Sequence, residues 1–445
     1  MTAKLPPGPR APKLVQTMGW WSRTAPYMER CRRRYGKRFT LRMLGTPPFV
    51  MLSDPADVKE VFTAPPEVLH PGEGARLLEP LVGRNSVILL DEARHLEQRK
   101  LMLPAFHGER MEALADLVEE VTEREVATWP RDEPFPLHTR LQALTLEVIL
   151  RAVFGLEEGQ RLDALRTRLT GILEFTVNPL SLFPDLRRSF AGRGPYATVD
   201  RLQAEADALI AELVEERRRD GEDRGDVLSM LLEARHEDGS PMTGEELRDE
   251  LMTLLAAGHE TTASALAWAF ERLSRSPEAL GSLVDEVDGG NGDEYLTAVI
   301  NETLRRRPVI PNAAPRLIME EIDVGGWTYP PGACLIAHAY LIHHDPEIYP
   351  DPYAFRPERF LGTKPGTYTW IPFGGGRRRC LGAGFAVLEM KAVLRQVLAH
   401  HELRPAADGF ESTHRRSITV SPRRGAVVAL GPRARTREAD PALAA

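Results

Sequence analysis

The sequence predicts a mostly α-helical protein with a minor β portion, and three observations support this fold class. Apolar residues recur at helical spacing in one segment after another between residues 92 and 306. Short strand-like segments separated by turns follow Pro308. No internal repeat and no clear interdomain linker divides the 445 residues. We therefore assign residues 1–430 to a single domain and expect 431–445, which has little to bury, to form a disordered tail.

Composition and charge bear on the compartment of the protein and on whether it binds nucleic acid or spans a membrane. Only three cysteines occur, too few for a disulfide framework, which suits a reducing cytoplasm. The formal net charge of −7 argues against nucleic acid as a partner. The most apolar window, 251–270, carries His259 and Glu260 at its centre and fits a buried helix better than a membrane span. Residues 1–42 hold eleven Lys and Arg against one acid, which favours a solvated helix face or a docking or membrane-surface patch.

The N-terminal part of the chain combines helical and strand patterns. The elements expected there are a proline-rich lead-in at 6–12, a helix at 25–34, strands at 39–44 and 49–52, a helix at 54–63 and a loop at 65–84. The helices expected next are 92–103, 108–128, 137–154, 158–176, 198–219, 226–237, 245–274, 277–286 and 294–306. Glycines and prolines at 178–195 interrupt this series and predict a mobile loop over the binding pocket.

The C-terminal part changes to short strands and turns. Strands are expected at 316–319, 327–329 and 334–340, followed by a loop-rich tract to 369, a helix from 381 to 400 and a closing hairpin at 415–429. The helix at 245–274 begins with Thr243-Gly-Glu-Glu246, a capping box.

The segment Phe373-Gly-Gly-Gly-Arg-Arg-Arg-Cys380 is the most informative stretch of the chain. Three consecutive glycines let the backbone approach a bound group closely. Cys380 lies at the start of a helix, where free N–H groups and the positive end of the dipole favour a thiolate. A thiolate beside guanidinium groups suits an iron porphyrin with its two propionates. The alternative is an inert buried cysteine in a basic loop.

The spacing Phe373-x-x-Gly376-x-Arg378-x-Cys380-x-Gly382 resembles the haem-binding loop of the cytochrome P450 family, with every fixed position filled. The resemblance implies a triangular helical domain that holds haem b (iron protoporphyrin IX) between a long oxygen-binding helix and the cysteine loop. Cys380 would be the axial iron ligand, and Arg378 would bind a haem propionate. Phe373 would pack under the thiolate, with Gly374 and Gly382 lining the haem.

A second motif lies at the centre of the 245–274 helix. Ala257, Gly258 and Thr261 form a small-residue face that leaves room for a flat macrocycle, or else for a closely packed neighbouring helix. The Thr261 hydroxyl can bond the carbonyl four residues earlier. Glu260-Thr261 resembles the acid–threonine pair that relays protons to dioxygen in the family, so both are expected to be catalytic.

Three weaker motifs follow the order of the family. Glu302-x-x-Arg305, with Arg359 further along, resembles the buried triad that braces the cysteine loop, although alone it would read as a surface ion pair. His95 and Arg99 lie one helical turn apart, as on an exposed basic face, and resemble propionate ligands. Arg316 resembles a further propionate contact, which gives four donors with Arg378.

The resemblance implies a haem-thiolate monooxygenase that hydroxylates or epoxidises a hydrophobic small molecule, such as a terpene, steroid, fatty acid or polyketide. No phosphate-binding loop or dinucleotide fingerprint occurs, so the electrons are expected to come from NAD(P)H through a ferredoxin reductase and a ferredoxin. The protein is expected to be a cytoplasmic monomer. Two alternatives remain open: a peroxygenase that uses hydrogen peroxide, and a non-catalytic haem sensor or carrier.

Overall fold

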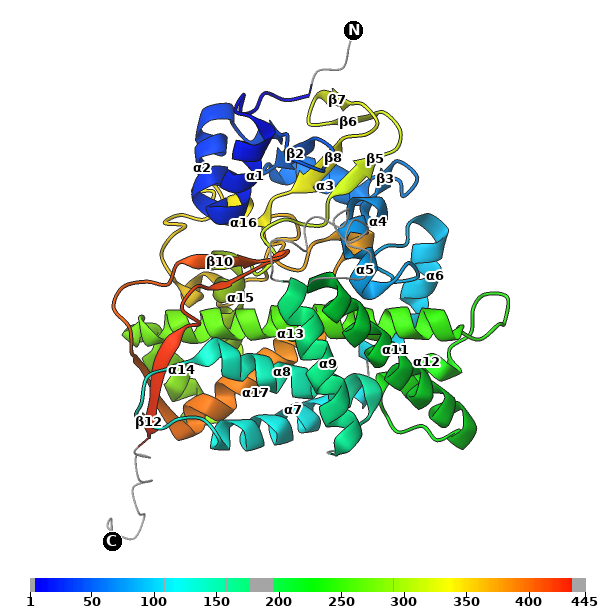
Figure 1. Cartoon of the computed structure of the whole chain (residues 1–445). Coiled ribbons are helices and arrows are strands. Elements are labelled where there is room, and N and C mark those ends of the chain that lie inside the picture. The colour runs from blue at the N-terminus through cyan, green and yellow to red at the C-terminus, as the bar shows by residue number, and fades with distance from the viewer. Residues whose placement is uncertain (1–4, 107–108, 157–158, 177–194, 291, 434–445) are drawn as a thin grey trace.

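The 31-residue helix α13 (Gly244–Ser274) crosses the middle of the molecule (Figure 1). This computed structural model describes residues 5–106, 109–156, 159–176, 195–290 and 292–433. The predicted capping box begins α13: Thr243 Oγ1 accepts from Glu246 N at 3.2 Å, and the Glu246 carboxylate accepts from Thr243 N at 2.8 Å. Most of α13 is buried, which agrees with the predicted apolar helix.

Helices make up most of the structure, as the sequence predicts, and α8, α17 and β11 pack along α13. The other helices are α1 (Lys13–Ser22), α2 (Thr24–Tyr35), α3 (Pro55–Thr63), α4 (Pro71–Gly74), α5 (Glu79–Val82), α6 (Glu92–Met102), α7 (Glu109–Ala127), α8 (Leu137–Phe154), α9 (Gln160–Thr176), α11 (Pro195–Asp220), α12 (Val227–Glu233), α14 (Pro277–Gly289), α15 (Glu294–Arg306), α16 (Ala339–His343) and α17 (Ala383–His400). The 3₁₀ helices are η1 (Arg76–Leu78), η2 (Leu103–Phe106), η4 (Pro357–Phe360) and η5 (Gly376–Arg378). Buried side chains of α7, α8, α13 and α17 share the largest apolar core.

Strands form small sheets that lie mainly to one side of α13 (Figure 1). Their bounds are β1 (Arg38–Leu41), β2 (Phe49–Leu52), β3 (Leu69–His70), β4 (Phe135–Pro136), β5 (Arg316–Ile318), β6 (Ile322–Val324), β7 (Trp327–Tyr329), β8 (Cys334–Ala337), β9 (His401–Pro405), β10 (Thr413–Arg416), β11 (Thr419–Pro422) and β12 (Val427–Pro432). The five-stranded sheet has the order β1-β2-β8-β5-β3, with β2 parallel to β8 and its other pairs antiparallel. This sheet and α3 share a second apolar core.

Several predicted boundaries are wrong, and local chemistry explains them. The tract 65–84 is not a plain loop, because Pro71 and Pro80 occupy first-turn positions that start α4 and α5. The strand predicted at 334–340 ends at Ala337, and the His338 side chain caps α16. The helix predicted at 226–237 ends at Glu233, before a turn that contains Gly239.

The predicted C-terminal hairpin is also placed wrongly. β10 pairs with β11, whereas β12 leaves that hairpin and pairs with β9 and β4. A turn closed by Gly425 N and Pro422 O at 3.2 Å, with Gly425 at φ +80°, redirects the chain between them. β12 continues to Pro432, two residues past the expected domain end. The sequence predicts the loop at 178–195 and the tail at 431–445, but Pro195 begins α11 and β12 includes 431 and 432. Residues 178–194 of the predicted loop and 434–445 of the predicted tail lie outside the described residues.

A search of the described helices for a stretch long and apolar enough to cross a membrane finds none.

Candidate functional site

The cysteine loop is shaped by glycines packed against α3. Gly374 and Gly376 have φ values of +67° and +63°, which side-chain-bearing residues rarely adopt. A Cβ on Gly375 would lie 2.3 Å from the Phe62 ring, and one on Gly376 would lie 2.3 Å from the Phe62 carbonyl oxygen. Gly375 and Gly376 are therefore needed for the close approach of this loop to α3, and Gly374 for its left-handed backbone.

Cys380 is held just before α17, because its N–H donates to the Phe373 carbonyl at 3.0 Å. Its side chain is exposed, whereas Cys31 and Cys334 are buried with pKa values raised to about 11 and about 12 by burial. The surrounding protein also raises the pKa of the Cys380 thiol by desolvating it. The Gly382 N–H and the Arg379 charge lower the pKa but do not cancel this effect. The thiolate predicted from helix position is thus not favoured by the chain alone; coordination to a metal would deprotonate the thiol.

The small-residue face of α13 contains two side chains that are not buried. Ala257 is exposed and Thr261 is partly exposed one turn further on, although most of the helix is buried. Thr261 Oγ1 donates to the Ala257 carbonyl at 2.5 Å, as predicted. A Cβ on Gly258 would lie 2.8 Å from Ile149 Cδ1 of α8, so close helix packing explains this glycine. Contact between Gly258 and a cofactor stays a prediction.

Glu260 is held by side chains from three elements. Its carboxylate accepts from Gln142 Nε2 of α8 at 2.7 Å and from Ser264 Oγ of α13 at 3.1 Å. Arg416 Nε of β10 forms an ion pair with Glu260 Oε1 at 3.0 Å. Burial raises the pKa of Glu260, and the Arg416 charge and these hydrogen bonds oppose that shift. A proton-carrying role therefore requires the carboxyl to exchange at least one of these partners.

The structure brings the four predicted propionate ligands together. His95 is buried, and burial together with Arg378 and Arg99 lowers its pKa to about 3, so it is a neutral donor. Arg99 also lies within electrostatic range of Cys380, and burial lowers its pKa. Arg378 turns inward and donates to Asp91 Oδ1 at 2.5 Å and to the Leu90 carbonyl.

Arg316 provides the clearest sign of a missing anionic partner. Its side chain is buried against the Phe62 ring, 4.6 Å from the centroid, and Nη1 has no hydrogen-bond partner among the described residues. Burial, and then the charge of Arg378, lower its pKa to about 9. An unpaired buried guanidinium is costly. In the described part of the chain, Asp91 is the one carboxylate bonded to this cluster of four donor side chains. The remaining donors could bind a group with two carboxylates, as haem has.

Replacing Arg316 with glutamine is expected to weaken haem retention while leaving the fold intact, because the variant removes an unpaired buried charge. Loss of one charge-assisted hydrogen bond predicts haem transfer to apomyoglobin roughly 10–100-fold faster than in the wild type. Arg415→Gln is a matched control: Arg415 is also buried, but it bonds Thr24 Oγ1 at 3.1 Å and stacks on Trp20. Equal haem transfer from the wild type and Arg316→Gln would contradict this role.

Glu302, Arg305 and Arg359 lie together as the family motif implies. Arg305 donates to both Glu302 oxygens, at 2.6 and 2.8 Å, and both side chains are 0% exposed. Arg359 Nε lies 3.5 Å from Glu302 Oε1. Arg305 also donates to the carbonyls of His343 and Pro352 at 2.7 and 2.9 Å.

His343 connects this triad to the cysteine loop, a role that no sequence motif indicates. Its Nε2 accepts from Ile371 N at 2.9 Å, two residues before Phe373. Burial lowers the pKa of His343 to about 3, which keeps that nitrogen an acceptor. His343 is followed by His344, and two adjacent histidines rarely bind the same metal ion. The sequence therefore offered no reason to assign His343 a role in supporting the cysteine loop.

Glu389 is a second residue that the sequence did not single out. It lies on α17, is 2% exposed and bonds Thr262 of α13. Burial raises its pKa to about 8. The folded chain therefore holds this proton up to about pH 8, whereas the unfolded chain loses it above about pH 4.5.

Glu389 is consequently expected to lower stability as the pH rises from about 4.5 to about 8. The free energy of unfolding of the wild type should fall steadily relative to that of Glu389→Gln as the pH rises through this window. Urea denaturation at pH 5, 6.5 and 8 measures this difference, with Glu402→Gln as an exposed control on β9. A difference that does not change with pH would contradict it.

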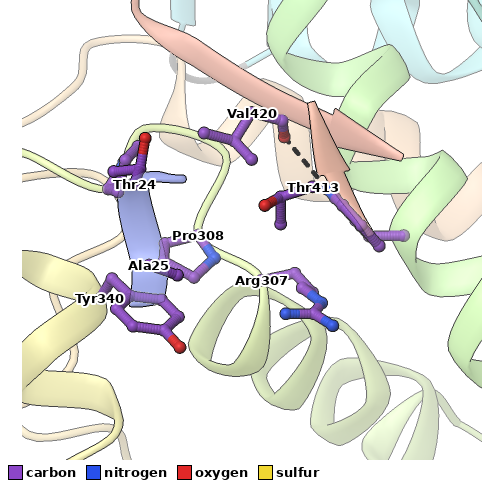
Figure 2. Close-up of a pocket in the computed structure, with 9 residues that line it drawn as sticks. Thr24, Ala25, Arg307, Pro308, Tyr340, Thr413 and Val420 are labelled. Atoms are coloured by element: carbon purple, nitrogen blue, oxygen red, sulfur yellow. Dashed lines mark hydrogen bonds between the residues drawn. The ribbon is translucent and has the colours of Figure 1, made fainter. Parts of the chain in front are cut away.

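Two cavities lie apart from these residues. The one in Figure 2, with a volume of about 20 Å³, is lined by α2, α13, α16, the segment after α15 and the β10–β11 hairpin, and it holds at most one water molecule. An open cleft of about 640 Å³ lies between the segment after α5, the helix α11 and the start of α13. Neither is lined by a predicted site residue.

The chain is similar to known proteins over nearly its whole length. The family model described as Cytochrome P450 matches residues 6–428. The chain is 41% identical over 429 residues to "Putative cytochrome P450 138" of Mycobacterium tuberculosis, covering 96% of each chain. It is 40% identical over 429 residues to "Putative cytochrome P450 135B1" of Mycobacterium bovis, covering 95% of this chain and 90% of that protein.

Two solved structures share the fold. One is a retinoic acid-bound cyanobacterial CYP120A1, with a TM-score of 0.82 and 22% identity over 97% of this chain and 100% of that one. The other is the haem domain of cytochrome P450DA, with a TM-score of 0.82 and 23% identity over 97% of this chain and 98% of that one. With its cysteine loop, its buried triad and a family match over nearly its whole length, this chain belongs to the cytochrome P450 family.

Proposed function

We propose that the protein is a haem-thiolate monooxygenase that hydroxylates or epoxidises a hydrophobic small molecule with O₂ and two electrons. Membership of the family supports a haem-dependent monooxygenase. The observation that carries the proposal is the donor cluster around Cys380, in which the buried Arg316 Nη1 has no partner among the described residues. Terpenes, steroids, fatty acids and polyketides are the substrate classes to test.

Haem b would be held by Cys380 at its iron and by His95, Arg99, Arg316 and Arg378 at its propionates. Bound there, the group supplies oxygen activation, which a thiolate ligand promotes by donating electron density. The chain orients it through the glycines that bring the loop against Phe62. Ala257, whose small side chain is exposed on α13, would leave space for the macrocycle, with the backbone of Gly258 beside it.

Thr261 and Glu260 would deliver protons during oxygen cleavage. The Thr261 hydroxyl holds its proton toward the Ala257 carbonyl and lies on the partly exposed face of α13. Burial raises the pKa of Glu260 toward neutral pH, and a proton donor works best when its pKa is close to the working pH. Arg416 would act as a positioning residue, since its ion pair holds Glu260 between turnovers.

The electron donor would be an acidic ferredoxin, served by its reductase and NAD(P)H. Arg377 and Arg379 are exposed beside the ligand, and Arg395 is exposed on α17. Opposite charges steer association, and salt screens that steering. The three free cysteines accord with a reducing compartment such as the cytoplasm.

Turnover assays test the proposal. A hydrophobic library is screened for ligands that change the haem spin state, and these are supplied with a surrogate ferredoxin, its reductase, NADPH and O₂. We expect product from this system and none from hydrogen peroxide alone. Product only with peroxide would indicate a peroxygenase, and a haem-loaded protein that turns over no ligand would indicate a sensor or carrier.

A further inference from the structure

The outward face of α1 is apolar. Leu14, Val15 and Met18 are 56%, 53% and 60% exposed, and their i, i+1, i+4 spacing places them on one side of the helix. Gln16, by contrast, is buried, and its Nε2 donates to the carbonyls of Pro9 and Ala11 at 3.2 and 2.8 Å. A surface helix normally turns its apolar side chains inward, and Trp20 of α1 does pack against the core, but Leu14, Val15 and Met18 face outward.

A fourth apolar side chain lies beside this face. Leu44 is 42% exposed, and its N–H donates to Thr17 Oγ1 of α1 at 3.0 Å. We call Leu14, Val15, Met18 and Leu44 the α1 patch. The helix lies at the edge of the molecule, next to α2 (Figure 1). Clustered exposed apolar residues of this kind mark an interaction surface.

Four exposed cations surround the α1 patch. Arg10 and Lys13 lie at the start of α1, Arg23 follows its end, and Arg42 bonds Gln16 Oε1 through its backbone N–H at 2.9 Å. Within the described chain, none of the four has a carboxylate partner. Arg32, Lys37 and Arg38 of the same region have carboxylate partners, as Arg38 has Asp57 at 2.5 Å. Three exposed cations on the neighbouring helix α2 add to the free charge, since the described chain gives Arg30, Arg33 and Arg34 no carboxylate partner. The unpaired charge contrasts with the net charge of −7 for the whole chain.

We propose that the α1 patch and its four cations dock on an anionic phospholipid membrane surface. The apolar side chains would enter the boundary between headgroups and acyl chains, as those of interfacial amphipathic helices do. Arg and Lys side chains extend to lipid phosphates while their stems cover apolar surface. An acidic protein would satisfy the cations, but an anionic lipid layer takes up both the cations, at its phosphates, and the outward apolar side chains.

Vesicle flotation with the haem-loaded full chain tests the proposal. The probes are vesicles of phosphatidylcholine alone and of phosphatidylcholine with 30% phosphatidylglycerol, each in low and high salt. We expect the wild type to bind the anionic vesicles at least ~10-fold more tightly than the neutral ones, and less tightly as salt rises. Equal binding to both vesicles, or to neither, would overturn it.

Two variants separate the apolar and charged contributions. The combined Leu14→Gln, Val15→Gln, Met18→Gln variant should bind anionic vesicles at least ~10-fold more weakly. The combined Arg10→Gln, Lys13→Gln, Arg23→Gln, Arg42→Gln variant should lose ~100-fold or more and with it the salt dependence.

Control variants carry changes of the same kind elsewhere on the surface, four for the charges and one for the apolar side chains. The charge control replaces Arg94, Arg131, Arg219 and Lys364 with glutamine, and the apolar control is Met319→Gln on an exposed side chain. Both should bind within about twofold of the wild type, and all variants should keep its melting temperature, because every replaced side chain is exposed. Wild-type binding by the patch variants, or equal losses in the controls, would contradict the proposal.

Discussion

Replacing Glu302 with alanine is expected to lower the free energy of unfolding by about 3–5 kcal/mol, because it leaves the Arg305 guanidinium buried and unpaired. Glu302 and Arg305 are both 0% exposed, and Arg305 also bonds the carbonyl of His343. His343 accepts in turn from Ile371, so the cysteine loop should lose its support and the variant its haem. Urea denaturation and haem content measure the two effects.

Glu358→Ala is the matched control for this prediction. Glu358 lies on η4, close to Arg359, and is exposed, with its carboxylate accepting from the Tyr295 hydroxyl at 2.6 Å. Its loss should cost no more than about 1 kcal/mol. A Glu302→Ala protein as stable as this control, with full haem, would show that the triad does not brace the loop.

Thr261→Ala is expected to uncouple electron use from product formation. The variant should still bind haem and consume NADPH, but it should release more of the reducing equivalents as hydrogen peroxide, because a proton donor is missing. Glu260→Gln should slow turnover by roughly 100-fold or more, since an amide cannot shuttle a proton. The ratio of product to NADPH and the melting temperature are the readouts.

Thr262→Ala is the control on the neighbouring residue. The Thr262 side chain is buried and bonds Glu389, so its loss should lower the melting temperature without changing the coupling ratio. If Thr261 and Glu260 only stabilise α13 locally, their variants will also have a lower melting temperature and an unchanged coupling ratio. Unchanged coupling in both would rule out the proton relay.

Elements with a local signal could be predicted from the sequence, and the others could not. The predicted bounds of α8 are those of the structure, and the capping box fixed the start of α13. The helix α1 was missed because Leu14, Val15 and Met18 face outward while Gln16 faces inward. β9 follows α17 directly and is defined by its pairing with β12, a long-range contact that no local pattern encodes.

The candidate site divides in the same way. The motif spacing indicated which residues gather, and the structure brings His95, Arg99, Arg316 and Arg378 to one cluster. The motif spacing could not reveal the ion pair of Glu260 with Arg416, because 155 intervening residues separate these two in the sequence. Gly258 likewise could not be assigned from sequence, since only the position of Ile149 shows why a side chain would not fit there.

The spectrum of the reduced protein with carbon monoxide tests the central claim most directly. A thiolate-ligated haem gives a strongly red-shifted Soret band, and we expect this band from the wild type and from Cys31→Ser and Cys334→Ser, whose cysteines are buried elsewhere. Cys380→Ser should lose the band completely. A red-shifted band that survives in Cys380→Ser, or that is absent from a haem-loaded wild type, would contradict the assignment of Cys380 as the iron ligand.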